Sequence, residues 1–530
     1  MEREEKNSPG GILGMWKNIR LRLLAQGIAV GVSSGLVVVL YRIALERAED
    51  FRKLVLGAAS GNLTVSALWF LALVAAGLFT GHLIRREPLI SGSGIPQVEA
   101  VLARKIDMDW VSVVTRKFIG GAVAIGAGLS LGREGPSIQL GAAAGQGLGR
   151  IFKRTRTEEK YLITSGASAG LAAAFNAPLA GVMFSLEEVH RHFSPLVLLS
   201  AMSAALTADL VSARFFGLSP VFHVGEVTAL PLEYYGYIII LGIIVAVFGV
   251  IFNRSILMSQ DAYGKMSFIP KNFRILIPFI LAGILAFLYP AALGGGHGIF
   301  DSLMEGSMTV NAILLALAIK YLFTMVCYGS GAPGGIFFPL LVLGALTGGA
   351  YGNLLSDLLG VEPVFIKNFV ILAMAGYFTA IVRAPITGSI LITEMTGSFT
   401  HLLSLSVISL TAYVVADLMR SEPIYESLLE RLLKKGGQTF TGNKKNKVMI
   451  EIPVFMDSRL DGMHIRDMGL EPNCLIVNVG RGGHDIIPRG DTLLHSGDCI
   501  TLLVEETSAS EVKEKLKILG GSSGEQIFHE

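Results

Sequence analysis

Apolar residues fill long stretches of this chain, and polar residues gather in short segments between them. A helix needs about 20 predominantly apolar residues to cross a bilayer core about 30 Å thick. Several of the apolar stretches are shorter than this or are interrupted by glycine and proline, so the pattern predicts broken helices beside spanning ones. The stretches that predict helices are residues 24–48, 67–84, 111–131, 161–184, 195–211, 234–252, 273–288, 312–327, 335–354, 370–380 and 402–419.

The pattern changes near residue 436. Residues 436–447 form a polar segment that is flexible by composition. Short alternating runs then predict strands at 448–454, 475–479, 484–487 and 500–505, followed by an amphipathic helix at 510–519. The predicted fold is an all-α polytopic membrane protein with a small α/β domain. Its expected parts are an N-terminal segment 1–20, a membrane domain 21–435, a linker 436–447, the small domain 448–520 and a tail 521–530.

Composition supports this division. The chain of 530 residues is 52% hydrophobic and 16% charged, whereas soluble domains carry about 25% charged residues. Of its 44 + 42 = 86 charged side chains, 24 lie in residues 436–530, which leaves 62 for residues 1–435. The 62 glycines favour close helix contacts and broken helices over simple lipid-facing spans. The last part of the chain therefore has the composition of a soluble domain.

Charge also indicates location and excludes some partners. The net charge of +2 gives no support to nucleic-acid binding. The N-terminus lacks the apolar core and cleavage site of a signal peptide, and basic segments at 85–86 and 153–160 obey the positive-inside tendency if they are cytoplasmic. We expect a multi-pass protein of the inner or plasma membrane with both termini in the cytoplasm. The three cysteines are scattered and predict neither a metal site nor a disulfide.

Two motifs occur twice. An Ala-Pro-x-x-Gly motif followed by a glutamate spans 177–187 and recurs at 384–394, an offset of 385 − 178 = 207. A Gly-x-x-x-Pro motif with two further glycines spans 132–145 and recurs at 335–348, an offset of 335 − 132 = 203. The same order at nearly the same offset predicts a duplicated membrane unit. Such units build transporters whose substrate site lies at the repeat interface, near mid-membrane.

The repeat sorts the acidic side chains. Glu187 has a counterpart in Glu394, which favours a shared structural role such as ending a helix or bonding backbone. Glu188 and Glu134 have no acidic counterpart, and intramembrane carboxylates are usually functional. These two are the candidates for chemistry. The alternative for Glu134 is that it only neutralises Arg133 at a helix start.

Three Gly/Pro turns open predicted helices. Helix N-termini carry unpaired N–H donors and about half a positive charge, so converging ends make an anion site without a buried lysine. Ser93 adds a hydroxyl donor. The residues of the turns are Gly92, Ser93, Gly94, Ile95 and Pro96; Gly132, Arg133, Glu134, Gly135 and Pro136; and Gly335, Ile336, Phe337, Phe338 and Pro339, the last preceded by Gly331, Ala332, Pro333 and Gly334.

With the motifs GSGIP, GREGP and GIFFP in this order, the chain resembles the CLC family of chloride channels and chloride/proton antiporters over about residues 21–435. The resemblance implies an inverted-repeat bundle assembled as a homodimer, with one anion pathway in each subunit. It implies that Glu134 is the external gate and Glu188 the internal proton-transfer residue. The anion-binding residues implied are Ser93 and Tyr425, through their hydroxyls, and Ile336 and Phe337, through their backbone N–H groups. For Tyr425, the alternative is that its side chain anchors the protein at the membrane interface.

The histidines that follow Glu188 have two interpretations. His190 and His192 are spaced as a relay or metal pair, but a pair of histidines lacks a full ligand set. A solvated loop is the favoured reading. We therefore predict no metal site there.

The small domain resembles the TrkA-C type of regulatory domain over about residues 447–519, through the runs SRLDGMHIRDMGL and CLIVNVGRGGHDIIPRGDTLLHSGDCITLLV. The resemblance implies dimerisation and a small ligand, with cyclic dinucleotides among those the domain class accepts. A passive dimer clamp is the alternative. Because the segment bearing Tyr425 leads into this domain, movement of the domain is expected to act on the anion site.

These features predict a chloride/proton exchanger, which is a transporter and not an enzyme and needs no cofactor. Chloride, protons, the bilayer and a second copy of the chain are the expected partners. Alternatives are a passive chloride channel of the same fold and a fluoride exporter, which the Ser93 filter pattern disfavours. A membrane-anchored ligand sensor would not need a duplicated unit with buried acids.

Overall fold

The computed structural model describes residues 9–435, apart from 192, 223, 226, 271 and 272, and residues 447–520, apart from 457, 471–473, 483, 506 and 507. Most of the predicted linker, the predicted tail 521–530 and residues 1–8 lie outside the described residues. The chain forms two compact units, Met1–Gly436 and Gly437–Glu530. Each unit has its own hydrophobic core.

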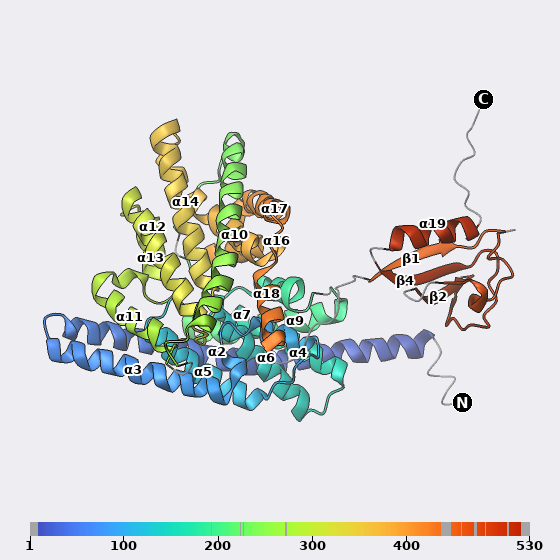
Figure 1. Cartoon of the computed structure of the whole chain (residues 1–530), viewed down its shortest axis with the longest axis horizontal. Helices are drawn as coiled ribbons and strands as arrows, with labels where there is room; N and C mark the ends of the chain where they lie inside the picture. Colours follow the sequence, from blue (N-terminus) through green and yellow to red (C-terminus); the bar gives the residue numbers. More distant parts are fainter. Residues whose placement is uncertain are drawn as a thin grey trace. The chain divides into compact units, whose positions relative to one another are not determined.

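The first unit is a bundle of helices that run in very different directions (Figure 1). Short helices alternate with long ones, as the interrupted apolar pattern predicts. The helices are α2 (Pro9–Ala59), α3 (Leu63–Arg86), α4 (Ile95–Leu102), α5 (Trp110–Gly126), α6 (Glu134–Ile151), α7 (Arg156–Phe175), α8 (Pro178–Phe184), α9 (Pro195–Phe216), α10 (Tyr235–Lys265), α11 (Leu276–Leu288), α12 (His297–Met304), α13 (Val310–Gly329), α14 (Phe337–Leu359), α15 (Ile366–Val382), α16 (Pro385–Thr396), α17 (Leu402–Leu418) and α18 (Ile424–Lys435).

Eight helical segments among the described residues are long and apolar enough to cross a membrane. Helices such as α4 and α8 are too short to span, which confirms the prediction of broken helices. The predicted stretch 161–184 shows the cause of one break. Asn176 ends α7 in the left-handed conformation with φ 51°, and Pro178 starts α8. Proline at a first helical position lacks an N–H that would have no partner there.

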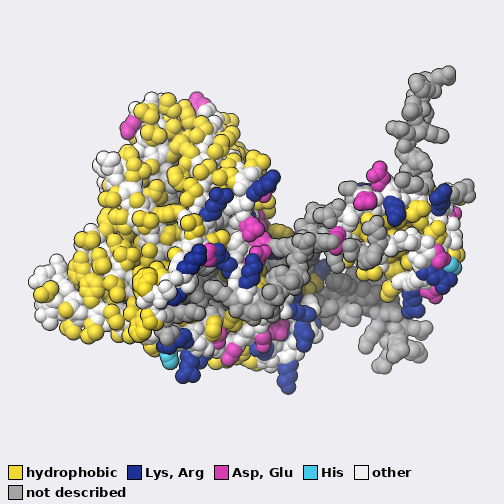
Figure 2. Space-filling model, in the orientation of Figure 1, with side chains coloured by type: hydrophobic (Ala, Val, Ile, Leu, Met, Phe, Trp, Pro, Cys, Tyr) yellow, Lys and Arg dark blue, Asp and Glu magenta, His cyan; other side chains and the backbone are white. Residues whose placement is uncertain are grey.

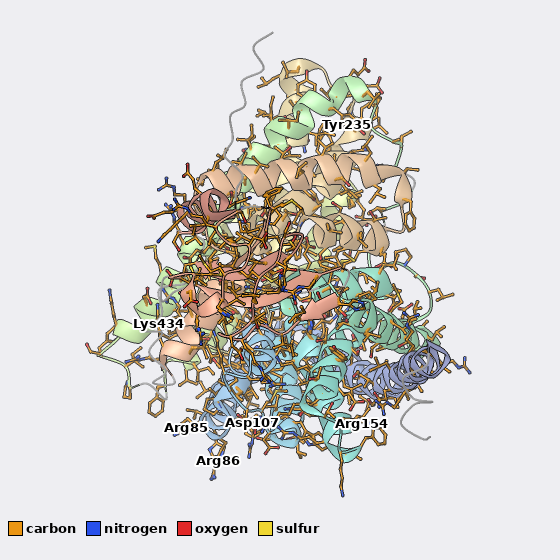
Figure 3. All side chains as sticks on the ribbon, turned by 90° about the vertical axis from the view of Figure 1, so that its right-hand side faces the viewer. Arg85, Arg86, Asp107, Arg154, Tyr235 and Lys434 are labelled. Carbon is orange, nitrogen blue, oxygen red and sulfur yellow. The ribbon has the colours of Figure 1, made fainter. Side chains whose placement is uncertain are left out.

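The surface of the first unit is consistent with a membrane environment. Large apolar side chains such as Leu71 and Leu210 are exposed, and hydrophobic side chains cover most of the visible face (Figure 2). Lys and Arg side chains gather toward the right-hand end of this unit as drawn. Figure 3 looks onto that end and labels Arg85, Arg86 and Arg154 there. These belong to the basic segments predicted to face the cytoplasm.

In each repeat, two neighbouring helices pack closely through glycine, and the two helix pairs are equivalent. A Cβ on Gly141 of α6 would lie 2.1 Å from the carbonyl oxygen of Gly166 on α7. In the second repeat, a Cβ on Gly348 of α14 would lie 2.2 Å from the carbonyl oxygen of Phe369 on α15. Contacts this short exclude any larger residue. The repeated glycines therefore set the spacing of these helix pairs.

The paired glutamates connect the two repeats to each other. The Glu187 carboxylate accepts hydrogen bonds from the backbone N–H groups of Ile386 and Thr387, at 3.3 and 2.8 Å, in the first turn of α16. The Glu394 carboxylate accepts from Leu179 and Ala180, at 3.1 and 2.7 Å, in the first turn of α8. Each acid thus caps the helix of the other repeat and balances its dipole. This is the structural role that their symmetry predicts.

The second unit is a four-stranded antiparallel sheet in the order β1-β4-β2-β3, with a helix after the last strand. Its buried side chains alternate along the central strand, since Ile500, Leu502 and Val504 point into the core. The predicted strands and helix are all present. The elements are β1 (Lys447–Pro453), β2 (Leu475–Arg481), β3 (His484–Ile486), β4 (Cys499–Glu505) and α19 (Ala509–Gly520).

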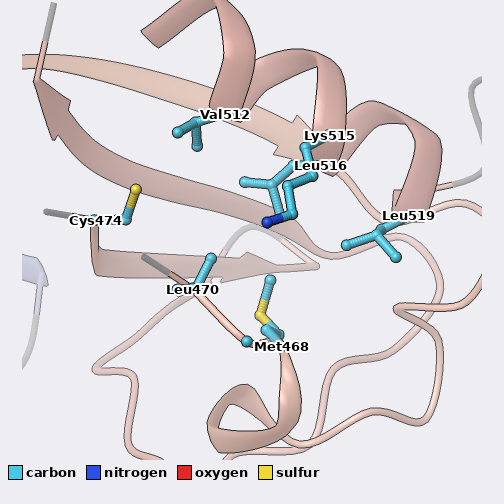
Figure 4. Close-up of a pocket in the computed structure, with 8 residues that line it drawn as sticks. Met468, Leu470, Cys474, Val512, Lys515, Leu516 and Leu519 are labelled. Carbon is cyan, nitrogen blue, oxygen red and sulfur yellow. The ribbon is translucent and has the colours of Figure 1, made fainter. Parts of the chain in front are cut away.

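A small hollow lies between α19 and the segment after residue 467 (Figure 4). Its volume is about 10 Å³, which is room for about one water molecule. A cyclic dinucleotide does not fit in this hollow. The lining residues are Met468, Gly469, Leu470, Cys474, Val512, Lys515, Leu516 and Leu519.

One ion pair with a buried carboxylate links β2 to the turn before β4. Asp498 is 1% exposed and accepts two hydrogen bonds from the Arg481 guanidinium, at 2.8 and 2.7 Å. Its Oδ2 also accepts the backbone N–H of His495 at 2.8 Å. Burial alone would raise the pKa of Asp498, but these hydrogen bonds from Arg481 and His495 hold it below its ordinary value.

We expect Asp498→Asn to lower the free energy of unfolding of this unit by about 1–3 kcal/mol, because Arg481 loses its charged partner. Since the folded state lowers the pKa of Asp498, its contribution is present above the ordinary aspartate pKa and disappears as the pH falls through the folded-state value. Urea unfolding of residues 437–530 at neutral and acid pH measures both effects. An equal loss for the variant at pH 7 and pH 2 would contradict this account.

Candidate anion and proton site

The three predicted turns meet in the first unit. The N–H of Gly92 donates to the carbonyl of Gly331 at 3.3 Å, and the N–H of Gly334 donates to the carbonyl of Gly92 at 3.0 Å. Gly132 and Gly335 exchange two backbone hydrogen bonds of 2.7 and 2.8 Å. These two glycines are equivalent positions of the two repeats. The repeat interface therefore brings the starts of α4, α6 and α14 together.

The first turn places Ser93 against the second. Gly94 has φ 99°, a left-handed conformation that suits glycine, and a Cβ there would lie 2.4 Å from Gln139 Oε1. A Cβ on Gly135 would lie 2.6 Å from Ser93 Oγ. The Ser93 hydroxyl is buried and accepts the N–H of Ile95 in a long contact of 3.4 Å. Pro96 follows in the first turn of α4.

Glu134 is the first residue of α6 and is 1% exposed. Its Oε2 has no hydrogen-bond partner among the described residues. It lies beside Gly132 and near the backbone N–H of Phe338, because a Cβ on Gly132 would be 2.2 Å from this oxygen and 3.0 Å from that nitrogen. The carboxylate therefore sits over the N-terminus of α14. The nearby Arg133 charge acts on this carboxylate, but the two side chains form no ion pair in the described part of the chain.

A narrow cavity of about 60 Å³ leads to Glu134. Charged side chains contribute to its walls, among them Glu46, Glu49 and Arg52 of α2. Sequence reasoning did not assign these three to the site, since they lie far from the motifs along the chain. The cavity therefore places charged side chains of α2 in the same space as the Glu134 carboxylate.

Tyr425 lies in the interior and is not an interfacial anchor. Its side chain is 0% exposed, and its hydroxyl has no hydrogen-bond partner within the described residues. Its ring contacts Phe184 edge-on at 6.3 Å, and Phe184 contacts Phe337 at 6.0 Å. The hydroxyl is within electrostatic range of Glu134 and Glu188. The remaining motif residues, Ile336, Phe338, Pro136 and Pro339, are buried around the same helix ends.

Glu188 lies in a π-helical turn, η2 (Ser185–Val189), directly after α8. Its side chain is buried, and its Oε1 lies 3.2 Å from Nη2 of Arg191. A second buried acid, Glu99 of α4, lies 3.8 Å from the same nitrogen. π-helical turns occur frequently at functional sites. The structure thus brings Glu188 next to an acid and a base that the motifs did not indicate.

His190 contacts α7. Its Nδ1 is 2.9 Å from the Thr164 hydroxyl. His192 lies outside the described residues. The described residues contain no cluster of His, Cys, Asp and Glu that could hold a metal ion.

Two buried lysines, which sequence reasoning did not assign to the site, bind backbone carbonyls beside the turns. Lys117 donates to the carbonyls of Ile90 and Gly92, at 2.9 and 2.7 Å. Lys320 donates to the carbonyls of Ala292 and Gly294 in the second repeat, at 2.9 and 2.6 Å. The signal was present in the sequence, because 320 − 117 = 203 is the repeat offset. Each lysine charge offsets carbonyl oxygens that would otherwise repel an anion.

A fourth helix start was also missed. The run Gly294 to Gly296 precedes His297, the first residue of α12, and Gly296 has φ 104°. It is equivalent to the first turn, because 297 − 95 = 202. His297 stacks on Phe338 with ring centroids 4.0 Å apart. This run contains no proline, which is why the search for Gly/Pro turns did not find it.

Comparison with known proteins decides the family. A family profile described as "voltage gated chloride channel" matches residues 76–417, more than half of the chain. The protein belongs to the CLC family. A second profile, for the TrkA-C domain, matches residues 449–517 in the second unit.

Individual relatives of this CLC protein agree with the profiles. It is 36% identical to the H(+)/Cl(-) exchange transporter ClcA of Vibrio campbellii over 425 residues, 78% of this chain and 90% of that protein. It is 35% identical to ClcA of Yersinia pseudotuberculosis over 79% of this chain and 89% of that protein. Among solved structures, a slow cyanobacterial Cl-/H+ antiporter matches with TM-score 0.75 and 31% identity, over 78% of this chain and 99% of that one. A CLC-type fluoride/proton antiporter shares the fold at 24% identity, with TM-score 0.64, over 76% of this chain and 97% of that one.

We expect Gly135→Ala to weaken anion binding by the CLC unit, because the added methyl group forces the Ser93 turn away. Overpacking of this kind costs about 1–3 kcal/mol. Gly236→Ala is the matched control, since a Cβ at Gly236 meets no atom within 4 Å. Calorimetric titration of the purified protein with chloride measures the affinity. Equal affinities for both variants would show that the contact does not set the site.

Proposed function

We propose that this CLC protein exchanges chloride for protons across the membrane. The observation that carries the proposal is the position of the Glu134 carboxylate beside the N–H of Phe338, at the N-terminus of α14. An ionised carboxylate is itself an anion, and a helix N-terminus attracts anions. Glu134 therefore competes with chloride for the same donors. The printed names of the relatives in Vibrio and Yersinia support exchange rather than passive conduction.

Protonation of Glu134 is the step that couples the two ions. When its carboxylate gains a proton, it loses its charge and its attraction to the α14 end. The side chain then leaves, and chloride takes its place among the helix ends. When chloride leaves, Glu134 gives up its proton toward the opposite side and returns. Proton movement and chloride occupancy therefore require one another.

Ser93, Tyr425, Ile336 and Phe337 are proposed to hold the central anion. The buried Ser93 and Tyr425 side chains offer hydroxyl donors, and the Tyr425 hydroxyl is left without a partner among the described residues. Ile336 and Phe337 stand at the start of α14, where backbone N–H groups lack partners within the helix. Phe184 and Phe337 supply the apolar wall. An anion at this place would pair the hydroxyls and the N–H groups together.

Glu188 is proposed to take up protons at the other end of the route. It lies in the turn directly after Phe184, so one continuous element joins the wall of the anion site to this acid. Its burial beside Arg191 keeps it out of bulk water while leaving a charged partner at the surface. Transfer then proceeds from Glu188 toward Glu134.

Reconstitution in liposomes tests the exchange. A chloride gradient should drive protons uphill through the native protein. Glu134→Ala and Glu188→Gln should each lower proton flux by about 100-fold or more, because each removes a proton carrier, while chloride flux persists. Glu187→Gln is the matched control, since Glu187 caps a helix and carries no proton in this scheme.

Other outcomes of this experiment have distinct meanings. Chloride flux without any proton movement in the native protein would identify a passive channel. Proton movement driven by fluoride but not by chloride would identify a fluoride exporter. Full coupling in both acid variants would overturn the assigned roles of Glu134 and Glu188.

We further infer a homodimer in the cell membrane with cytoplasmic termini and the domain order predicted above. The two compact units and the two matched ranges support that order. The TrkA-C-like unit is proposed to regulate transport through α18, which carries Tyr425 and ends at Lys435, directly before the linker. A ligand would act by favouring one position of α18.

Deletion of residues 436–530 tests this regulation. If the second unit biases α18, the truncated protein should transport chloride at a changed rate and lose any response to cyclic dinucleotides. Chloride efflux from liposomes, with and without cyclic di-AMP, measures both. Unchanged rate and unchanged response would reduce the second unit to a passive clamp.

A further inference from the structure

One arginine lies among three carboxylates at the Glu188 end of the site. Arg191 Nη2 is 3.2 Å from Oε1 of Glu188 and 3.8 Å from Oε2 of Glu99. Its Nη1 is 3.6 Å from Oε2 of Glu426. These four side chains are named the inner cluster. It was not visible in the motifs, because its members come from three separate parts of the chain.

The inner cluster joins three elements around one exposed cation. Glu99 belongs to α4, Glu188 to η2 and Glu426 to α18. The Glu99 and Glu188 side chains are 4% and 6% exposed, whereas that of Arg191 is 38% exposed. The Glu426 side chain is 22% exposed, so the cluster reaches solvent through Arg191 and Glu426.

The backbone of Arg191 is held in an unusual conformation. Its φ of 54° is left-handed, which is uncommon for a residue other than glycine. This conformation turns the side chain back, so that Nε donates to the carbonyl of Glu188 at 3.0 Å and Nη2 to its carboxylate. Such conformations persist where surrounding contacts fix them, and they gather at functional sites.

The charges of the inner cluster do not balance. Among these four side chains one guanidinium faces three carboxylates, two of which are buried, so Arg191 is shared between several acids. Like charges at this range disfavour ionisation of one another, and an opposite charge favours it. The proton occupancy of Glu188 therefore depends on how the charge of Arg191 is shared. Glu99 competes for it from α4, and Glu426 competes for it from α18.

Three other titratable groups lie near Glu188, on its own element and on neighbouring ones. Its neighbour Glu187 is bound to the first turn of α16. His190 is bound to Thr164 of α7. The Tyr425 hydroxyl of α18 is within electrostatic range of Glu188.

We propose that Arg191 is a positioning residue whose charge, shared between Glu188 and Glu426, sets the pH at which Glu188 takes up its proton. The proposal rests on the proposed function of Glu188. Because Glu426 follows Tyr425 on α18, the same helix reaches the anion site with one residue and the inner cluster with the next. A displacement of α18 then changes the charge sharing at Glu188 as it moves the Tyr425 hydroxyl.

The two arms of this arrangement have opposite consequences. Without Arg191, Glu188 is left with acids alone and binds its proton more tightly. Without the charge of Glu426, Arg191 is shared with one acid fewer, and Glu188 binds its proton less tightly. A purely structural role would slow transport in both variants without moving their pH dependence in opposite directions.

The test is proton transport by the full chain in liposomes, measured as a function of pH on the Glu188 side. Arg191→Gln should move the midpoint of this pH dependence to higher pH by about one unit or more. Glu426→Gln should move it to lower pH by a smaller amount. Arg191→Lys, which keeps a cation, should restore the midpoint toward the native value. Arg214→Gln, on the exposed last turn of α9, is the matched control and should leave the midpoint unchanged.

Each outcome decides a specific point. Shifts of opposite sign, with rescue by lysine, support the proposal. The proposal is overturned if all three variants, Arg191→Gln, Glu426→Gln and Arg191→Lys, keep the native midpoint. Shifts of the same sign in Arg191→Gln and Glu426→Gln also overturn it. If the native protein moves no protons against their gradient, the proposed function fails, and the role of Arg191 fails with it.

Discussion

The pair of hydrogen bonds between Gly132 and Gly335 is the interaction on which the rest of the site depends. These bonds of 2.7 and 2.8 Å join equivalent backbone positions of the two repeats. Because each glycine lies two residues before the first residue of a helix, joining them also fixes the starts of α6 and α14 against each other. A side chain at Gly132 would collide with the Glu134 carboxylate at 2.2 Å. The bare backbone is what lets an acid from one repeat lie over the helix end of the other.

Bare backbone exposes carbonyl oxygens as well as N–H groups, and only the N–H groups favour an anion. The protein resolves this with Lys117 and Lys320, each of which binds two loop carbonyls. The two ammonium groups bind these carbonyls inside the protein and do not point at the anion. An ammonium group in direct contact with chloride would bind it too firmly for rapid release. The helix ends thus provide attraction of moderate strength, and the lysines remove the opposing dipoles.

Local patterns and the repeat were sufficient to predict the broken helices, the three turns and the structural role of Glu187. Each of these features depends on residues that are close along the chain, or on a motif that occurs in both repeats. The buried lysines had the same repeat signal, but single lysines in apolar stretches carry no motif. Within the inner cluster only Glu188 and Arg191 are close along the chain, and Glu99 and Glu426 meet them only when three distant elements pack together. Contacts between remote elements were the part that sequence reasoning could not reach.

The duplicated scaffold explains the position of the site, but it does not supply every side chain of the site. Both repeats supply equivalent helix starts, glycines and lysines, and these meet at the interface between the repeats. Helix α18 breaks this equality. The position 203 residues before its start falls in the non-helical segment near Val221, so α18 has no counterpart in the first repeat. Tyr425 and Glu426 both come from this unrepeated helix, and they face the side of the scaffold that carries Glu188. The single helix that follows the second repeat therefore carries one residue of the proposed anion site and one residue of the inner cluster, and it directly precedes the linker.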